Sequence, residues 1–382
     1  MSYGLGLQQW VRTGTLHREL AIYRLLQQMG WRITLVTYDR DRIPPDPGFP
    51  ARVWTLWPYP FLRGKLRTVY YLLMPFLRWS ATRRQGVLIT NQAHMGWPAI
   101  VAKWVWGTPL LARSGAVFGE QLPLSGMAGE WRARLRRDLE RKVYDVCDHA
   151  VVPTPELRTW VMNNYGVPPE KISVHPNNVD TDRFQPDPAI TPDPLSLVTI
   201  ARHHPVKRVD LAIRAIARTD YHLTVIGDGP QRTELATLAQ TLEAKVTFIS
   251  RVENEELPAL LHRMGAYLIT GITEGHPKAL IEAMACGMAC IGTHGQGITN
   301  ILADGVNGLL CDDEPASVRQ ALDHLRENPA LRLSLGQAAR EFVVREYALT
   351  TLAHQLDAIL CRLLHPDSTP RTHATPSQRT PA

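Results

Sequence analysis

The chain has 382 residues, a formal net charge of +6, and a composition that is 45% hydrophobic and 20% charged. This composition is that of an ordinary globular protein, and it argues against a largely disordered chain. A single core rarely reaches this length, so two domains are expected, and the moderate excess of basic residues favours an anionic partner.

The five cysteines lie at positions 147, 286, 290, 311 and 361, and none form a C-x2-C pair. A reducing compartment with buried thiols is therefore expected. Residues 1–30 show no basic stretch followed by an apolar block, and no run approaches the roughly 20 apolar residues of a membrane-spanning helix. We expect a cytoplasmic location, at most peripheral on the inner face of the membrane.

The chain begins with a short Gly-containing turn at residues 2–7, which holds Gly4 and Gly6. A nucleotide-binding α/β domain normally opens with a strand before such a turn, and Met1 leaves almost no room for one. The sequence therefore predicts either that the true start lies upstream or that the first domain lacks a central strand.

The first half of the chain then alternates between expected helices and strands. This alternation predicts a parallel, doubly wound sheet whose right-handed crossovers place the ligand-facing loops on one edge. The expected strands cover residues 31–37, 51–56, 86–90, 109–113, 149–153 and 172–175, and the expected helices cover 13–29, 65–80, 96–106, 130–146 and 155–165.

A basic and aromatic region lies within this half. Residues 47–119 contain nine Lys or Arg and no Asp or Glu, and all ten Trp precede residue 161. The mixture of basic, aromatic and Leu residues in 61–79 is typical of a helix on an anionic membrane surface. A core-facing helix with solvated basic residues fits equally well. Nucleic acid is less favoured, because no recognised nucleic-acid module is present.

Residues 176–194 are turn-rich and end in the Pro/Asp linker DPAITPDP, which marks a domain boundary. We place an N-terminal domain at 1–186, a C-terminal domain at 195–345 and a final helix at 346–364. The tail, 365–382, is rich in Thr and Pro and is expected to be disordered.

The second half repeats the alternation, which again predicts a parallel sheet with helices on both faces. An amphipathic helical segment is expected at 330–363. The expected strands cover 195–200, 222–226, 245–249, 266–270, 288–292 and 308–311, and the other expected helices cover 207–218, 230–242, 255–263, 277–286, 297–303 and 315–326.

The stretch EGHPKALIEAMACG, residues 274–287, carries two carboxylates eight residues apart. Glu274 lies in the turn after an expected strand, and Glu282 lies about 8 Å further along the following helix. Two carboxylates so placed can accept hydrogen bonds at two points of one extended polyol. The spacing alone also fits a turn residue followed by a charge on a helix surface.

Two further turns contain residues suited to a phosphate group. Arg202 and Lys207 bracket the turn ARHHPVKR, where a helix N-terminus expected at about residue 206 would favour an anion. Solvated surface charges are the alternative. In IGDGP, residues 226–230, Gly227 and Gly229 allow a ligand or another stretch of backbone to come close.

Taken together, these strings resemble the donor-site signature of retaining glycosyltransferases of GT-B fold, glycosyltransferase family 4 (group 1 type). The resemblance is carried by EGHPKALIEAMACG, by the R-x4-K spacing of Arg202 and Lys207, by IGDGP and by the interdomain string NNVDTDRFQP, and it covers most of residues 13–350. It implies two Rossmann-like doubly wound domains that face a central cleft, with a C-terminal helix that crosses back onto the first domain.

The resemblance also implies roles for individual residues. Arg202 and Lys207 would stabilise the diphosphate as its bond to the sugar breaks, Glu274 would lie beside the sugar, and Glu282 would accept from the ribose hydroxyls. No metal, cofactor or enzyme nucleophile is expected. The other implied donor-binding residues are Gly227, Gly229, Arg251, Val252, Gly275, His276, Pro277, Lys278 and Ala279, and the implied acceptor-side residues are Gly4, Gly6, Arg113 and Ser114.

Three positions depart from the family pattern. Ser114 stands where many members carry a His, and Asn300 stands at the Glu position of GG-x-x-E. Asn178 replaces the Gly of Asn-Gly-Val-Asp, although Asn tolerates a positive φ well enough to keep the same turn. The first two changes are compatible both with an unusual acceptor and with a degenerate, non-catalytic relative.

By resemblance, the expected activity is transfer of a sugar, with retention, from a UDP- or GDP-sugar to a glycan or lipid-linked acceptor in envelope polysaccharide or glycolipid synthesis. The expected partners are the nucleotide-sugar donor, the acceptor and an anionic membrane surface, without nucleic acid. An inactive binding or scaffolding subunit of GT-B fold is the alternative. An epimerase or phosphorylase of the same fold remains a further one.

Overall fold

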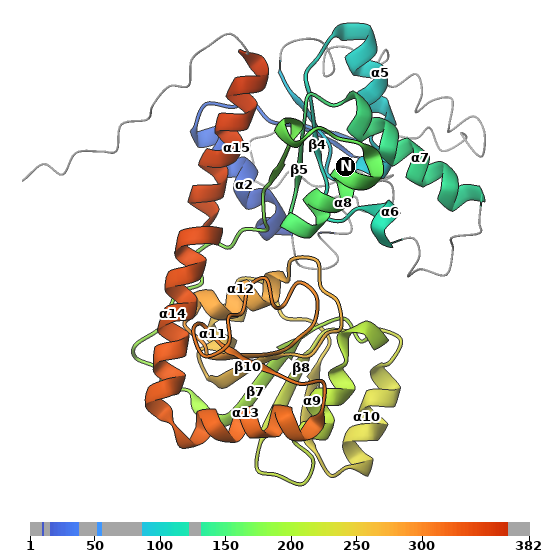
Figure 1. Cartoon of the computed structure of the whole chain (residues 1–382). Helices are drawn as coiled ribbons and strands as arrows, with labels where there is room; N and C mark the ends of the chain where they lie inside the picture. Colours follow the sequence, from blue (N-terminus) through green and yellow to red (C-terminus); the bar gives the residue numbers. More distant parts are fainter. Residues whose placement is uncertain (1–9, 11–15, 38–51, 56–85, 122–130, 366–382) are drawn as a thin grey trace, which may run out of the picture.

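The computed structural model describes residue 10 and residues 16–37, 52–55, 86–121 and 131–365 (Figure 1). They form two α/β domains that lie one above the other, with the last helices running along both. Several predictions concern residues outside the described ranges. They are those for Gly4 and Gly6, for a strand before them, for the helix at 65–80 with the basic and aromatic segment 61–79, and for the tail.

The second domain is built on one parallel sheet of six strands in the order β12-β11-β10-β7-β8-β9. The strand order reverses beside the central strand β7, so the carboxyl ends of β7 and β10 flank the crevice in which such sheets bind ligands. The strands are β7 Asp193–Ile200, β8 His222–Ile226, β9 Lys245–Ile249, β10 Met264–Ile269, β11 Cys290–Thr293 and β12 Leu309–Cys311.

Helices cover both faces of this sheet, and side-chain alternation along the strands divides the core into two layers. Within β10, Tyr267 and Ile269 pack in one layer, while Ala266 and Leu268 pack in the other. The first layer lies under α11 Leu257–Leu261, α12 Lys278–Ala285 and α14 Pro329–Tyr347, and the second lies under α9 Val209–Ala215, α10 Arg232–Thr241 and α13 Pro315–Glu327.

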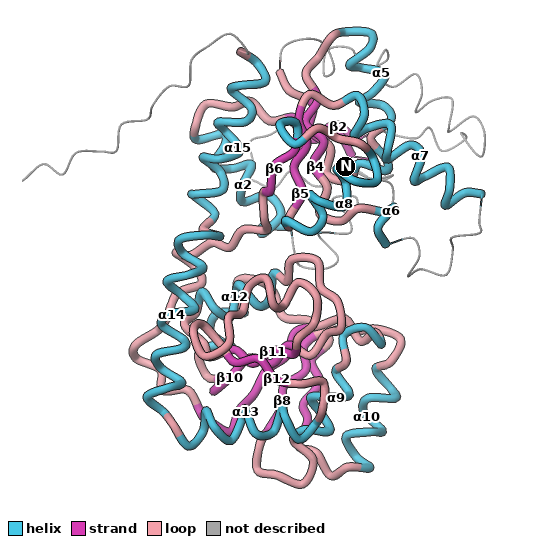
Figure 2. The backbone as a smooth tube through the Cα atoms, in the orientation of Figure 1, coloured by secondary structure: helices cyan, strands magenta, loops and turns pink. Residues whose placement is uncertain are grey.

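The first domain contains a four-stranded parallel sheet and a separate parallel pair, β1-β2 (Figure 2). The two sheets do not pair with each other within the described ranges. The four-stranded sheet consists of β3 Leu88–Ile89, β4 Leu110–Arg113, β5 His149–Val152 and β6 Ile172–Val174, and the pair consists of β1 Thr34–Thr37 and β2 Arg52–Thr55. The helices of this domain are α2 Leu16–Gln28, α5 Trp97–Trp106, α6 Phe118–Gln121, α7 Trp131–Val146 and α8 Pro155–Tyr165.

The chain crosses between the domains twice, and the two crossings touch. The backbone N–H of Val179 donates to Tyr347 O (3.0 Å), and the N–H of Leu349 donates to Val179 O (2.8 Å). Beyond this point α15, Leu349–Leu364, packs its apolar side against α2 of the first domain. The expected GT-B architecture with its C-terminal crossover helix is therefore confirmed.

Two expected elements differ from the structure. The helix expected at 297–303 is a set of tight turns, because Gly297 has φ +82° and the side chain of Asn307 bonds both Ala303 N and Ile301 O. The segment expected as one helix at 330–363 is two, α14 and α15. They are separated at Ala348, where the backbone is extended to pair with Val179.

Other boundaries shift by a few residues, and one turn differs in conformation. α9 begins at Val209 and ends at Ala215, so Lys207 lies in a 3₁₀ turn, η4 Pro205–Lys207, rather than in the helix. Asn178 does not adopt the left-handed conformation that its position suggested. Among the described residues, the non-glycine positions with positive φ are Arg208, Arg218 and Glu243.

The packing of α14 against the end of α12 generates a stability prediction. A Cβ at Gly336 would lie 2.1 Å from the carbonyl oxygen of Gly287, so Gly336→Ala forces two backbone segments apart. We expect a loss of about 1–3 kcal/mol in the free energy of unfolding, measured by urea denaturation. Ser334→Ala, on the exposed side of α14, is the matched control and should change stability by less than about 0.5 kcal/mol.

Candidate functional site

Three turns at the carboxyl edge of the second sheet are joined by backbone hydrogen bonds. The turn after β10 donates from Ile272 N to Val206 O of the turn after β7 (2.9 Å). It also donates from Glu274 N to Gln296 O (2.8 Å) and accepts at Ile272 O from Gln296 N (3.0 Å), in the turn after β11. These bonds fix the position of Glu274 relative to the other two turns.

Glu274 and Lys207, both predicted as catalytic, form an ion pair. Lys207 Nζ lies 2.6 Å from Glu274 Oε2, and both side chains are about 15% exposed. A Lys ammonium has three donors, so two remain available for a ligand. The pair therefore joins a cation suited to phosphate and a carboxylate suited to hydroxyls at the carboxyl edge of the sheet.

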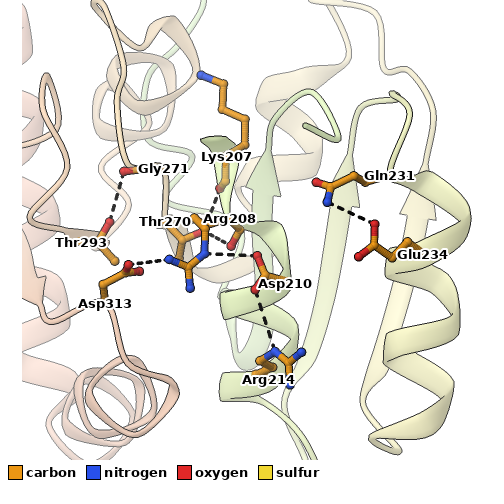
Figure 3. Close-up of polar contacts among 10 residues, drawn as sticks. All are labelled: Lys207, Arg208, Asp210, Arg214, Gln231, Glu234, Thr270, Gly271, Thr293 and Asp313. Carbon is orange, nitrogen blue, oxygen red and sulfur yellow. Dashed lines mark hydrogen bonds and ion pairs between the residues drawn. The ribbon is translucent and has the colours of Figure 1, made fainter. Parts of the chain in front are cut away.

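Arg208 fixes the backbone of this turn, a role that sequence reasoning did not assign. It has φ +48°, a conformation that costs a non-glycine residue about 1–2 kcal/mol. Its guanidinium lies between Asp210 (3.4 Å) and Asp313 (2.5 Å), and Thr270 Oγ1 donates to its carbonyl (2.8 Å), as Figure 3 shows. The Lys207 side chain extends away from this network.

Arg202 is exposed and forms no ion pair within the described ranges. The structure does not bring its side chain into contact with Glu274, unlike that of Lys207. Its turn is nevertheless anchored, because His203 N donates to Asp228 O (2.9 Å) and Gln231 N donates to His203 O (3.1 Å).

Gly227 and Gly229 approach the protein's own backbone. A Cβ at Gly227 would lie 2.1 Å from Ala201 O, and one at Gly229 would lie 2.5 Å from His203 O. Their φ angles are +137° and +156°, which side-chain-bearing residues rarely adopt. Of the two possibilities raised by the sequence, the structure shows the close approach of backbone, which supports the Arg202 turn.

Glu282 is buried at the boundary between the domains, with only 2% of its surface exposed. Its Oε1 accepts from Asn254 Nδ2 (3.1 Å) and lies 3.4 Å from Arg18 Nη1 of α2. The carboxylate lines a cavity of about 200 Å³. The other lining residues are His17, Arg18, Ala21, Arg24, Leu25, Gln28, Asn178, Val179, Asp180, Arg183, Phe184, Asn254 and Leu349.

Lys278, at the first turn of α12, also reaches the first domain. Its Nζ lies 2.5 Å from Glu19 Oε1 of α2. Burial would raise the pKa of Glu19, but Lys278 and Arg18 together hold that pKa below its ordinary value. The carboxylate of Glu19 is therefore charged at neutral pH, and the contact is an ion pair between the two domains.

His276 is held as a neutral residue by its surroundings. Burial, reinforced by the nearby Lys278, lowers its pKa to about 4. The ring packs edge-on against Tyr347 at 4.8 Å between centroids, and neither ring nitrogen has a partner among the described residues. Its carbonyl accepts from Asn177 Nδ2 (2.7 Å).

The remaining donor-side residues surround these groups. Gly275 is exposed, and a Cβ there would meet nothing within 4 Å, so the space above this turn is open to a ligand. Pro277 caps α12, and Ala279 follows in its first turn. Arg251 is exposed and pairs with Glu253, and Val252 is half-buried. No contact tests their predicted roles.

On the acceptor side, Arg113 and Ser114 lie at the end of β4. Arg113 Nη1 donates to the Tyr23 hydroxyl (3.2 Å), whose own proton is directed to Asn91 Oδ1 (3.0 Å). Ser114 is 2% exposed, and its Oγ accepts from Ala93 N (3.0 Å). Ser114 therefore orders two loops of the first domain, and its acceptor role stays a prediction.

Sequence reasoning missed the turn that supports Glu274. A Cβ at Gly295 would lie 2.0 Å from Gly271 O, and one at Gly297 would lie 2.1 Å from Glu274 O. The two glycines of GQG, residues 295–297, were the sequence feature that could have predicted this turn. Asn300, which replaces the family's Glu, donates to Glu156 Oε2 of α8 across the cleft (2.8 Å), where a carboxylate would be repelled.

No group of three or more His, Cys, Asp or Glu side chains suited to a metal ion occurs in the part of the chain that the structure describes. No helix in that part is long and apolar enough to cross a bilayer.

Two protein-family models match consecutive parts of this chain, which together cover residues 20–342. Residues 20–183 match Glycosyltransferase Family 4, and residues 180–342 match Glycosyl transferases group 1. The chain belongs to the group 1 glycosyltransferases of family 4. The boundary between the two matches falls in the crossing that contains Val179.

Curated relatives are moderately similar. The chain is 31% identical over 179 residues to N-acetyl-alpha-D-glucosaminyl L-malate synthase of Bacillus anthracis, covering 45% of this chain and 46% of that protein. It is 28% identical over 226 residues to the putative colanic acid biosynthesis glycosyltransferase WcaL of Salmonella typhimurium, covering 55% and 56%. These matches span about half the length of each relative.

Solved structures resemble the whole fold. Sucrose-phosphate synthase from Thermosynechococcus elongatus has a TM-score of 0.74 at 20% identity, covering 91% of this chain and 92% of that one. Anabaena Alr3699/HepE in complex with UDP-glucose has a TM-score of 0.70 at 16% identity, covering 90% and 95%. At these identities, the likeness supports the GT-B fold alone.

The partly buried His276, whose ring nitrogens are shielded from water, generates a pH prediction. Because its pKa is about 4 when folded and about 6.5 when unfolded, the unfolded chain binds more protons between these values. This group's contribution is therefore lost as pH falls from about 6.5 towards 4, by up to about 2 kcal/mol at pH 5. Replacing it with Phe, which keeps the packing on Tyr347, should flatten the decline in melting temperature between pH 7 and pH 5. Wild-type and variant curves that stay parallel would contradict this.

Proposed function

We propose that this glycosyltransferase moves a sugar, with retention, from a nucleotide-diphosphate sugar to an acceptor bound by the first domain. The observation that carries the proposal is the ion pair of Lys207 and Glu274 at the carboxyl edge of the sheet, beside the switch point between β7 and β10, where such sheets bind ligands. In one contact it supplies a cation for the diphosphate and a carboxylate for the sugar.

In this proposal, Lys207 uses its remaining two donors on the diphosphate, and the exposed Arg202 adds a second cation. Negative charge grows on the leaving phosphate oxygens as the glycosidic bond breaks, so cations already in place stabilise the transition state more than the ground state. Glu274, aligned by Lys207, accepts from sugar hydroxyls. Glu282 accepts from the ribose hydroxyls, and the acceptor attacks the face from which the diphosphate leaves.

The identity of the donor is proposed as a UDP- or GDP-sugar. Structures of Alr3699/HepE contain UDP and UDP-glucose, which supports a nucleotide sugar in a GT-B cleft of this shape. The resemblance to WcaL supports a role in envelope polysaccharide or glycolipid synthesis. Within the same proposal, no metal is required, because Arg202 and Lys207 supply the positive charge.

We also propose that the acceptor is reached at an anionic membrane surface, on its cytoplasmic side. The support is α7, whose Trp131 is 69% and Leu135 51% exposed, one helical turn apart. Asp138 and Asp145 are paired with Arg137 and Lys142. The exposed cations of this helix are Arg134, Arg136, Arg137, Arg141 and Lys142. Apolar side chains beside clustered cations fit the interface of an anionic bilayer.

The donor site is tested by turnover of UDP- and GDP-sugars. We expect Lys207→Ala to lower kcat by roughly 10²–10³-fold, the magnitude typical of losing one transition-state charge contact. Glu282→Ala should instead weaken nucleotide binding. Lys245→Ala removes an exposed ion pair with Asp220 elsewhere on the second domain and should leave kinetics unchanged.

Full activity of Lys207→Ala would remove the phosphate assignment. A wild-type chain that binds UDP or GDP and releases no product with any donor and acceptor would favour the binding or scaffolding alternative.

The membrane surface is tested by flotation of the full chain with vesicles that contain or lack phosphatidylglycerol. We expect binding to the anionic vesicles that weakens as salt rises, because exposed charges are screened. Arg134→Glu with Arg137→Glu should reduce it strongly, whereas Arg214→Glu on α9 of the second domain should not. Equal flotation with neutral vesicles, or none at low salt, would rule this surface out.

A further inference from the structure

Two adjacent residues of α2 in the first domain contact two charged residues of α12 in the second. Glu19 Oε1 lies 2.5 Å from Lys278 Nζ, and Arg18 Nη1 lies 3.4 Å from Glu282 Oε1. Lys278 and Glu282 are four residues apart and so share one face of α12. The two helices thus meet through two ion pairs of opposite polarity.

These four charges lie largely out of water. The side chain of Glu282 is 3% exposed, and those of Glu19 and Lys278 are 23% and 24% exposed. Buried ion pairs contribute little net stability, because desolvation offsets their attraction, whereas removing one partner leaves a buried charge uncompensated. Their main effect is therefore to specify how the first domain docks on the donor helix.

The contact made by Arg18 orients Glu282. Arg18 and Asn254 both bond Oε1, so the described contacts hold one oxygen of the carboxylate and leave the other for a ligand. The same carboxylate lines the interdomain cavity of about 200 Å³, together with side chains of α2. The carboxylate proposed for the ribose is thus fixed from the opposite domain.

A second layer of side chains braces this contact within the first domain. Tyr23, one turn along α2 from Glu19, accepts from Arg113 Nη1 (3.2 Å) and donates to Asn91 Oδ1 (3.0 Å). Asn91 lies in the loop after β3, and Arg113 is the last residue of β4. The position of α2 is therefore tied to the loops on the acceptor side.

We propose that Arg18 and Glu19 are positioning residues of the donor site. On domain closure, Arg18 orients Glu282 for the ribose and Glu19 holds Lys278, so the site is complete only when α2 is docked on α12. This inference rests on the proposed function. It makes donor affinity a property of both domains, and each nucleotide bound shifts the chain towards the closed arrangement.

Charge exchange between the helices tests the inference in the full-length chain. Glu19→Lys and Lys278→Glu each oppose like charges and should raise the donor KM and the Kd for UDP or GDP at least tenfold, about 1.4 kcal/mol. The double variant restores opposite charges and should recover most of this loss. Arg18→Gln should raise both constants with a smaller effect on kcat.

Lys103→Met is the matched control. Lys103 pairs with Asp148 at 2.6 Å with similar burial, but within the first domain and away from the cleft. It should change neither constant. Small-angle scattering provides a readout independent of turnover, because either single charge reversal should enlarge the radius of gyration of the nucleotide-bound chain and the double variant should reverse this.

Two results distinguish a failure of the proposed function from a failure of the positioning role of Arg18 and Glu19. If the wild-type chain binds neither UDP nor GDP and turns over no donor, the proposed function fails, and the inference fails with it. If the wild type binds nucleotide while Arg18→Gln binds within twofold of it, and the double variant is no better than the worse single one, the inference alone is overturned.

Discussion

The site depends on the hydrogen bonds that tie the turn after β10 to the turns after β7 and β11. Parallel strands bring these turns to one edge, but they do not fix their relative heights. The bonds from Ile272 to Val206 and from Glu274 to Gln296 do so, and they allow the Lys207–Glu274 pair to form at 2.6 Å. Glycines at 295 and 297 supply the space for the contact between the turns after β10 and β11, and those at 227 and 229 let the backbone of the Arg202 turn come close.

The candidate site residues differ in which domain supplies their contacts. The residues proposed for the sugar and the phosphates, Glu274 and Lys207, both belong to the second domain, and the hydrogen bonds described above hold their turns at the sheet edge. Glu282, the residue proposed for the ribose, is instead held by both domains, by Asn254 from its own and by Arg18 from the other. Loss of the contact with α2 would therefore remove one partner of Glu282, whereas both members of the Lys207–Glu274 pair belong to the second domain.

Much of the second domain could be predicted from its sequence, because its strands and helices follow regular apolar periods and its turns are marked by glycine. The partners of individual side chains could not be predicted, because they lie far apart in the sequence. Lys207 and Glu274 are separated by 67 residues, and Glu19 and Lys278 by 259. Ile298, Ile301 and Leu302 have helical spacing but are buried in tight turns. The break between α14 and α15 at Ala348 is not marked by Gly or Pro in the sequence. It follows from the pairing of Ala348 with Val179. The left-handed backbone conformation of Arg208 could not be predicted from the sequence either, because it is held by contacts with Asp210, Asp313 and Thr270.

The contact of Val179 with Tyr347 and Leu349 has a mechanical consequence. Both covalent links between the lobes pass through one small patch of paired backbone, so the lobes share a pivot in place of two independent tethers. Sliding or twisting would break those bonds, whereas swinging about the patch preserves them. In such a swing, the parts of the two domains far from the patch travel furthest and the region beside the pivot least, so α15 stays packed on α2.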